Sequence, residues 1–282
     1  MAQASREPDF VEAFARGLAV IRAFSLSHLA LSVSDVAAAT KLARPTTRRL
    51  LLTLEALGYV RSVDGMYELT PRVLELGTAY INARGMWDIA RPHLETLVSK
   101  TKESSSMSQL DGSDIVYTAR VAVPKIIGLS VQIGTRFPAY ATSMGRVLLS
   151  ELASKELDRV VKTPSASGVI PRMKFSRKEL DSSLAEIRKR GWAMSDEQLS
   201  LGIRSIAAPV RDSGGAIIAA VNVTVNASET SIATLKGEHL PKLLATARAI
   251  TADFAQWAPC QSLLLSCAES SSDLGDVGVV DE

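Results

Sequence analysis

The pattern of apolar and polar positions divides the chain into a shorter, mainly helical first part and a longer second part that contains strands. Apolar residues recur at helical spacing over 10–24, which predicts an amphipathic helix that packs beneath the next elements. The apolar positions of this helix are Phe10, Phe14, Leu18, Ile21 and Phe24. From residue 86 onward, strand-like runs alternate with helical segments, so we expect two domains.

Two helices followed by a hairpin are predicted over 34–69. Ser34 is expected to cap a short helix over 35–40, and Pro45 occupies the first position of a second helix, which ends at Gly58. The buried side of this second helix is predicted to consist of Leu50, Leu54 and Leu57, with Ala43 and Thr46 extending it. Two β-like runs, 59–63 and 66–69, surround a turn at 64–65 that is typical of a hairpin. This order predicts a winged helix-turn-helix domain over 9–69.

The outward side of the second helix is basic. With the leucines buried, Arg44 and Arg48 face away from the core, Arg49 lies on the flank and Thr47 lies near the border. The N-terminal half of a recognition helix presents such side chains to the major groove of DNA. We therefore predict that duplex DNA is contacted by Arg44, Thr46, Thr47, Arg48 and Arg49, and by Arg61 in the wing. The helix pair alone fits a solvated arginine-rich surface equally well, but the hairpin directly after it favours DNA binding.

A linker helix is predicted over 70–86, beginning at Thr70 and Pro71. Its apolar side consists of Val73, Leu74, Leu76 and Tyr80. Because the small first domain offers this side no obvious partner, we expect the linker helix to contact a second copy of the chain. The alternative is that it packs back on its own domain.

The second domain, predicted over 87–258, combines strands and helices. The predicted strands cover 104–110, 114–121, 126–133, 203–211 and 216–225, and the predicted helices cover 88–101, 143–152, 177–191 and 229–257. Pro241 is expected to kink or break the last helix. Hairpins that alternate with helices indicate an antiparallel sheet flanked by helices, which assigns the chain to the α/β (α+β) class. Residues 259–282, rich in serine and acidic residues, are predicted to form a disordered tail.

Composition and charge restrict the possible functions. The 282 residues are 46% hydrophobic, enough for two ordinary cores, and the net charge is only +2. Five basic residues lie between Lys41 and Arg61 against one acidic residue, so positive charge is concentrated at the predicted recognition helix. The chain begins with no secretory signal, and its longest apolar run, 216–225, is too short to span a bilayer. We therefore expect a cytoplasmic bacterial protein without membrane association.

Signatures of catalysis are weak. Ser143 beside Gly145 resembles a nucleophile turn, but the Gly-x-Ser-x-Gly context is absent and no histidine lies in a partner motif. Both cysteines, Cys260 and Cys267, lie in the tail, and the three histidines lack metal-ligand spacing, so neither a metal site nor a cofactor is predicted. A non-enzymatic, ligand-gated transcription factor explains both domains. An enzyme and an architectural DNA binder without an effector are the alternatives.

Several longer stretches resemble the IclR family of transcriptional regulators. They are 14–21, 56–60 and 69–74 in the first domain, and 110–112, 133–140, 142–149 and 202–210 in the second. The phrases Phe-Ala-Arg-Gly-Leu and Thr-Ser-Met-Gly-Arg are similar to the PcaR/PcaU/PobR branch, which controls bacterial aromatic catabolism through the β-ketoadipate pathway. The resemblance implies a homodimer or dimer of dimers on a palindromic operator, with a GAF-like C-terminal domain that senses a small molecule.

The resemblance also indicates where the small molecule binds. In the run 216–225, Asn222 and Thr224 share one face while the neighbouring valines share the other. This polar face fits a solvated sheet surface as well, but the family's pocket lies on matching strand positions. We therefore predict that Ser205, Asn222 and Thr224 line an effector pocket.

The predicted effector is a small carboxylate, an aromatic acid such as protocatechuate or 4-hydroxybenzoate or a later acid of that pathway. If Ser143 caps the helix that follows, the backbone N–H groups of Met144, Gly145 and Arg146 are available to the carboxylate, and Gly145 leaves room for its approach. The alternative is a helix end that is merely capped by its own serine.

Overall fold

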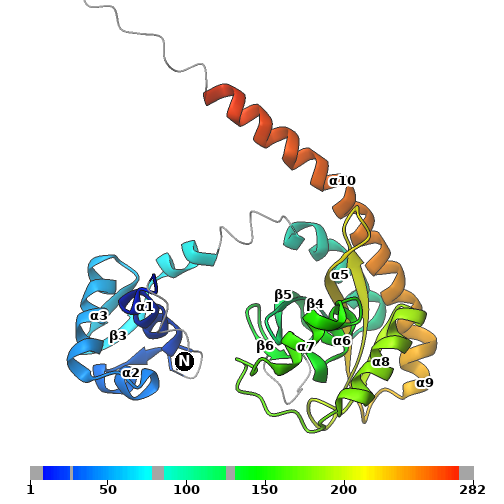
Figure 1. The fold of residues 1–282 in the computed structure, drawn as a ribbon, viewed down its shortest axis with the longest axis horizontal. Helices are drawn as coiled ribbons and strands as arrows, with labels where there is room; N and C mark the ends of the chain where they lie inside the picture. The colour runs from blue at the N-terminus through cyan, green and yellow to red at the C-terminus, as the bar shows by residue number, and fades with distance from the viewer. Residues whose placement is uncertain (1–8, 26–27, 78–85, 125–130, 273–282) are drawn as a thin grey trace, which may run out of the picture. The chain divides into compact units, whose positions relative to one another are not determined.

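A computed structural model describes residues 9–25, 28–77, 86–124 and 131–272, with side chains to residue 256. The chain divides into two compact units, Met1–Arg84 and Gly85–Glu282, whose elements are labelled in Figure 1. Each unit is described by itself.

The first unit is a small helical domain with a three-stranded sheet. Its elements are α1 (Glu12–Ala23), β1 (Ala30–Leu31), α2 (Val33–Thr40), α3 (Arg44–Ala56), β2 (Val60–Val63), β3 (Met66–Leu69) and the 3-10 turn η2 (Pro71–Leu74). The strands pair antiparallel in the order β1-β3-β2. Asp64 and Gly65 have φ values of 51° and 79°, as the tight hairpin turn between β2 and β3 requires. The predicted winged helix-turn-helix is confirmed.

The buried side of α3 differs from the prediction. The buried residues are Thr47, Leu51 and Leu54, whereas Leu57 is 52% exposed. Thr47 can be buried because its hydroxyl donates to the carbonyl oxygen of Ala43 at 3.2 Å, which satisfies the polar group within the helix. The helix is therefore turned about its axis relative to the expected orientation.

Two further details of this unit were predicted wrongly. Helix α2 is capped by Ser32, not Ser34, because Ser32 and Asp35 form a reciprocal capping box; the Ser32 N–H donates to Asp35 Oδ2 at 2.9 Å. These hydrogen bonds from Ser32 lower the pKa of Asp35. On α1, Phe14 and Leu18 are exposed, and the helix instead buries Val20.

The chain after the wing is helical as far as the structure describes it. Turn η2 begins at Pro71, with Thr70 as its cap, and residues 75–77 are helical. Leu74 and Leu76 are exposed. The rest of the predicted linker helix, including Tyr80, lies outside the described residues.

The second unit is built on a six-stranded antiparallel sheet (Figure 1). Its elements are α5 (Met86–Thr101), β4 (Ser104–Asp111), β5 (Asp114–Val121), β6 (Arg136–Pro138), η3 (Ala139–Ala141), α6 (Ser143–Leu149), α7 (Ser154–Lys162), α8 (Arg177–Arg190), β7 (Ala193–Asp196), β8 (Ile203–Arg211), β9 (Ile217–Asn226), α9 (Ile232–Thr234), the π-helical turn η4 (Leu235–His239) and α10 (Leu240–Ser272). The strand order is β6-β5-β4-β9-β8-β7.

Helices cover both faces of this sheet. Val221, Val223 and Val225 of β9 pack against the layer formed by α5 and α10, while Ala220 packs against the layer formed by α6, α7 and α8. The alternation along β9 is thus the one expected for a strand buried on two sides. The predicted α/β (α+β) class with a helix-flanked antiparallel sheet is confirmed.

Some elements of the second unit differ from the prediction. Of the expected strand over 126–133, residues 126–130 lie outside the described residues and 131–133 are not a strand; the edge strand is β6 instead. The helix does not break at Pro241: the chain is helical without interruption from Ile232 through η4 into α10, and the irregular π-helical turn η4 lies directly before the proline. Helix α10 continues to Ser272, so the predicted disorder is wrong for 259–272, while 273–282 are not described.

Candidate functional site

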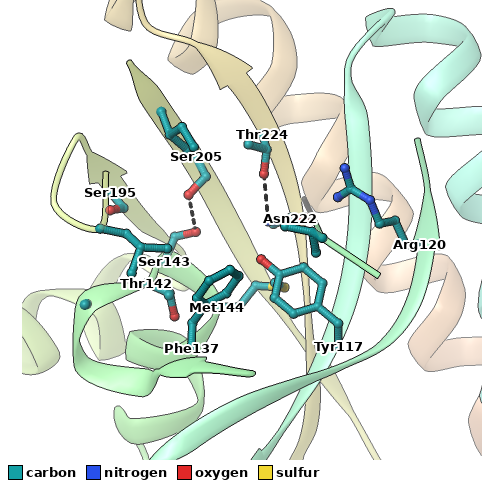
Figure 2. Close-up of a pocket in the computed structure, with 14 residues that line it drawn as sticks. Tyr117, Arg120, Phe137, Thr142, Ser143, Met144, Ser195, Ser205, Asn222 and Thr224 are labelled. Atoms are coloured by element: carbon teal, nitrogen blue, oxygen red, sulfur yellow. Dashed lines mark hydrogen bonds between the residues drawn. The ribbon is translucent and has the colours of Figure 1, made fainter. Parts of the chain in front are cut away.

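A cavity lies between the sheet and the start of α6 (Figure 2). It is lined by Tyr117, Arg120, Val131, Phe137, Ala141, Thr142, Ser143, Met144, Ser195, Leu199, Ile203, Ser205, Asn222 and Thr224. The structure thus brings together the predicted residues Ser143, Met144, Ser205, Asn222 and Thr224. The predicted Gly145 and Arg146 do not line the cavity.

Arg120 supplies the positive charge of the cavity. Its guanidinium is half-buried and donates from Nη1 to the hydroxyl of Ser106 at 3.0 Å. Within the described part of the chain, no carboxylate lies within ion-pair distance of it. Burial lowers the pKa of Arg120, and the nearby Tyr117 opposes this shift. A partly desolvated cation that lacks an anion is well suited to bind a carboxylate.

A β-bulge brings Arg120 to the same side as Tyr117. In a regular strand, residues three apart point to opposite faces of the sheet. Between β4 and β5, however, the register shifts, because Ser108 pairs with Tyr117 and Met107 pairs with Ala119. The extra residue, Thr118, changes the alternation of the strand. Both Tyr117 and Arg120 consequently line the cavity, while Ala119 packs in the core on the other face.

Two aromatic rings form part of the cavity wall. Tyr117 and Phe137 meet edge to face, with ring centroids 5.7 Å apart and an interplanar angle of 81°. Burial raises the pKa of the Tyr117 hydroxyl to about 12, because the ionised form is disfavoured away from water. Figure 2 shows this hydroxyl directed toward the centre of the cavity. The neutral phenol can donate or accept a hydrogen bond there.

Hydroxyl groups lie across the cavity from Arg120 (Figure 2). Ser143 of α6 and Ser205 of β8 share a hydrogen bond of 2.8 Å, and either oxygen can be the donor. Ser195 lies near them at the end of β7. This cluster can exchange hydrogen bonds with a polar group of a bound molecule.

Asn222 is already engaged by the protein. Its Oδ1 accepts from the Ser106 N–H at 2.9 Å and its Nδ2 donates to Thr224 Oγ1 at 3.0 Å. Because Ser106 also accepts from Arg120, a hydrogen-bonded row crosses β5, β4 and β9. Asn222 therefore fixes the floor of the cavity and orients Arg120 through Ser106.

At the start of α6, two of the three backbone N–H groups predicted to bind an anion are already engaged by the protein. The cap is Thr142, not Ser143; its hydroxyl accepts from the Gly145 N–H at 2.9 Å, and its carbonyl oxygen accepts from the Arg146 N–H at 3.0 Å. Gly145 is needed for packing, because a Cβ there would lie 2.0 Å from the carbonyl oxygen of Ala139. Only Ser143 and Met144 of the predicted set remain near the cavity at this helix end.

Arg146 is a structural residue of the neighbouring wall. It is 4% exposed, donates from Nη2 to the carbonyl oxygen of Met194 and to the side-chain oxygen of Gln198, and lies over the ring of Phe175 at 5.5 Å. Burial, with a smaller contribution from Arg190, lowers its pKa to about 10, so it remains charged near neutral pH. Its predicted contact with an effector is not supported.

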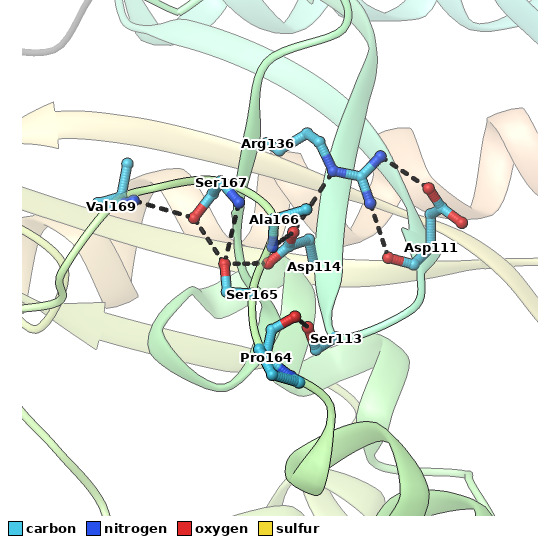
Figure 3. Close-up of polar contacts among 9 residues, drawn as sticks. All are labelled: Asp111, Ser113, Asp114, Arg136, Pro164, Ser165, Ala166, Ser167 and Val169. Atoms are coloured by element: carbon cyan, nitrogen blue, oxygen red, sulfur yellow. Dashed lines mark hydrogen bonds and ion pairs between the residues drawn. The ribbon is translucent and has the colours of Figure 1, made fainter. Parts of the chain in front are cut away.

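Strand β6 is held in place by Arg136, the residue before Phe137 (Figure 3). The guanidinium contacts Asp111 Oδ2 at 2.7 Å and Asp114 Oδ2 at 3.4 Å. These bonds tie the edge strand to the β4–β5 hairpin. They thereby set the position of Phe137 in the cavity.

The predicted DNA-contacting residues are exposed with two exceptions. Arg44, Arg48 and Arg49 are exposed on α3, and Arg61 is exposed in the wing, where it pairs with Glu68 at 2.8 Å. Thr46 is half-buried. Thr47 is fully buried, so its predicted contact with DNA is wrong.

Sequence reasoning missed several residues of the cavity, among them Tyr117, Arg120, Phe137 and Ser195. Strand alternation could not have indicated Arg120, because its direction depends on the bulge. Phe137 lies on a strand that the apolar pattern did not reveal. Ser195 could have been suspected, since it pairs with Ser205 in the β7–β8 register.

Neither a metal-binding cluster nor a membrane-spanning helix occurs among the described residues. No group of three or more histidine, cysteine, aspartate or glutamate side chains there is arranged to hold a metal ion. No helix in this part of the chain has the length and apolarity to cross a membrane.

The fold and the site define a class of protein: a winged helix-turn-helix unit with exposed arginines on its second helix, joined to a sheet domain with a cavity of ligand-binding character. Comparisons with known families agree. Residues 13–64 match the IclR helix-turn-helix domain, and residues 78–252 match the bacterial transcriptional regulator IclR C-terminal domain. The chain belongs to the IclR family of DNA-binding transcriptional regulators, which is not a family of enzymes.

Individual relatives support this assignment. The Pca regulon regulatory protein of Pseudomonas putida is 36% identical over 243 residues, covering 86% of this chain and 84% of the relative. A transcriptional regulator from Rhodococcus sp. RHA1 has a crystal structure with 46% identity and a TM-score of 0.76, covering 88% and 99% of the two chains. The PobR inducer-binding domain from Acinetobacter, solved as a double mutant with 3-hydroxybenzoic acid, is 28% identical, with a TM-score of 0.53 over 58% of this chain and 97% of that one.

Proposed function

We propose that this regulator senses a small aromatic carboxylate in the cavity and controls genes of aromatic catabolism in the β-ketoadipate pathway. The observation that carries the proposal is Arg120, a half-buried guanidinium in the cavity wall without a carboxylate partner among the described residues. Bound to a carboxylate, Arg120 would make charge-assisted hydrogen bonds that a neutral ligand cannot make.

The remaining lining fits the rest of such a molecule. The rings of Tyr117 and Phe137 offer an apolar surface for an aromatic ring, and the Ser143–Ser205 pair lies opposite Arg120 (Figure 2). A hydroxyl group para or meta to the carboxylate would point toward this pair once the cavity has widened to admit the ring. Hydroxybenzoates and protocatechuate have this arrangement of groups. The PobR inducer-binding domain was solved with 3-hydroxybenzoic acid, which belongs to the same class of ligand. The relative from Pseudomonas putida is named as a regulator of the pca regulon. Both relatives support the proposal.

Calorimetry with 4-hydroxybenzoate and protocatechuate on the wild type and on Arg120→Gln tests the proposal. Loss of a charged hydrogen bond should weaken binding roughly tenfold to a hundredfold. The neutral analogue 4-hydroxybenzamide is the matched control, because it has the same shape without the charge. We expect it to bind weakly and equally to both proteins. Equal affinity of the acid for wild type and Arg120→Gln would contradict the assignment.

We also propose that two copies of the chain bind a palindromic operator in the bacterial cytoplasm, as a dimer or a dimer of dimers. Arg44, Arg48 and Arg49 of α3 would contact the major groove, with Thr46 at the edge of this surface and Arg61 on the backbone beside it. A single small winged helix-turn-helix domain has limited affinity for DNA, and the domain of a second copy binds the second half-site of the operator. The exposed apolar residues Phe14, Leu18, Leu57 and Leu76 of the first unit support an interface between copies.

A further inference from the structure

The segment 163–176 is the feature of the second unit that the proposed function does not yet explain. It connects α7 to α8 and contains no regular secondary structure. Connections of this length in a compact domain are uncommon and are often functional. This one is not loose, because both of its ends are hydrogen-bonded to the parts of the fold that carry the cavity.

The first attachment is made by Asp114, the first residue of β5 (Figure 3). Its side chain is 1% exposed and accepts from the Ser165 hydroxyl at 2.6 Å and from the Ala166 N–H at 2.9 Å. The same carboxylate pairs with Arg136 of β6. Asp114 therefore joins the segment to the strand that carries Phe137.

The second attachment lies at residues 172 and 173. The Met173 N–H donates to the carbonyl oxygen of Gln198 at 3.0 Å, and the Arg172 N–H donates to that of Leu199 at 3.3 Å. Leu199 lines the cavity. Phe175, further along the segment, lies under Arg146, whose guanidinium also holds Gln198. The segment is thus joined to the β7–β8 connection as well.

These two attachments belong to different walls of the cavity. One wall runs from Phe137 through η3 to Ser143, and the other contains Ser195 and Leu199. The cavity as a whole has a volume of about 40 Å³, which holds a few waters and is smaller than an aromatic ring requires. A ring can therefore enter only when the walls move apart.

We propose that 163–176 is a strap that couples the two walls of the effector cavity, and that Asp114 is the positioning residue that determines how readily they separate. The inference rests on the proposed function for the identity of the ligand. The coupling itself is a property of the protein without ligand. A strap released from Asp114 leaves the β7–β8 wall less constrained, so local opening there becomes more frequent.

Amide hydrogen exchange on the full-length protein without ligand tests the coupling. Ser165→Ala removes the hydroxyl bond from the strap to Asp114, together with the two Ser165–Ser167 bonds inside the strap, and leaves the Asp114–Arg136 pair intact. Thr163→Ala is the matched control, because the Thr163 hydroxyl donates only within the end of α7, to the carbonyl oxygen of Arg159. We expect Ser165→Ala to accelerate exchange at 197–203, roughly tenfold, and Thr163→Ala to leave it unchanged. Faster exchange confined to 164–167 would overturn the proposal.

Effector kinetics provide the second readout. In Asp114→Asn and Ser165→Ala, 4-hydroxybenzoate should associate and dissociate faster than in the wild type. Stopped-flow tyrosine and tryptophan fluorescence measures both rates. Thr163→Ala should have the same rates as the wild type. Unchanged rates in Ser165→Ala, with thermal stability equal to wild type, would also overturn the strap. If the wild type binds no aromatic acid, the proposed function fails, whereas the exchange experiment still decides whether the walls are coupled.

Discussion

Arg120 and Arg146 show how two desolvated arginines of one domain differ in role. Burial is the main cause that lowers the pKa of each, and neither has a carboxylate partner among the described residues. Arg146 is occupied by carbonyl and amide oxygens and by an aromatic ring. Among the described residues, the hydrogen-bond partner of the Arg120 guanidinium is the Ser106 hydroxyl, and Arg120 faces a cavity. We expect a bound carboxylate to offset the cost of burying Arg120.

Tyr117 gives a pH dependence that can be measured without a ligand. A tyrosine ionises near pH 10 in the unfolded chain, and burial raises the pKa of Tyr117 to about 12 in the fold. Its contribution to stability is therefore complete below about pH 10 and is lost as the pH rises through 12. This amounts to roughly 2–3 kcal/mol over the window.

Urea unfolding of wild type and Tyr117→Phe across this pH range checks the prediction. The wild type should lose more stability between about pH 9 and 12 than the variant does. Parallel pH profiles for the two proteins would show that Tyr117 ionises in the fold as it does in the unfolded chain.

At the scale of elements, the sequence predicted the types and order of the helices and strands better than the faces that they bury. The hairpin turn at Asp64 and the alternation along β9 are local features, and both were recognised. The face that α3 buries depends on its partners in the core, and the helix is turned so that Thr47 is inside. The bulge in β5 depends on pairing with β4, so no local signal placed Arg120 in the cavity.

The two basic elements of the first unit should act differently on DNA. Arg48, near the N-terminus of α3, is expected to contact base edges, so Arg48→Ala should cost about 1–3 kcal/mol on the operator and less on random duplex. Arg61, in the wing, is expected to contact phosphates, so Arg61→Ala should weaken binding to all sequences similarly and lower the salt slope by about one. Mobility shifts at two salt concentrations distinguish the two effects. Equal losses of Arg48→Ala on both DNAs would refute its role in base readout.

At the scale of the whole molecule, the first unit has several large apolar side chains exposed on one groove. Phe14, Leu18, Leu57 and Leu76 are exposed and line a groove of about 820 Å³ between α1 and α3. Apolar patches of this kind mark interaction sites. We expect a second copy of the chain to cover this groove, because the proposed palindromic operator would bind two copies.

Charge in this groove should therefore separate the copies. Phe14→Glu and Leu76→Glu are expected to lower the molar mass measured by light scattering and to weaken operator binding, because a buried carboxylate without a partner is costly. Leu29→Glu is the control, since Leu29 is equally exposed in the same unit but lies outside the groove. Two groove variants that remain dimeric on the operator would exclude this interface.

The central claim is that an acid held by Arg120 changes the affinity of the regulator for its operator. An effector can shift DNA binding only if it binds one arrangement of the paired winged helix-turn-helix domains better than the other. The operator is first identified by selecting the sequences that the protein binds from a pool of random duplex DNA. The direct measurement is then a fluorescence anisotropy titration of labelled operator with the protein, with and without saturating protocatechuate or 4-hydroxybenzoate. We expect the acid to shift the affinity of the wild type for the operator roughly 5-fold to 150-fold. Arg120→Gln should bind the operator like wild type without the acid and should show no shift at the same acid concentration. An equal shift in both proteins, or no shift in a wild type that binds the acid, would contradict the central claim.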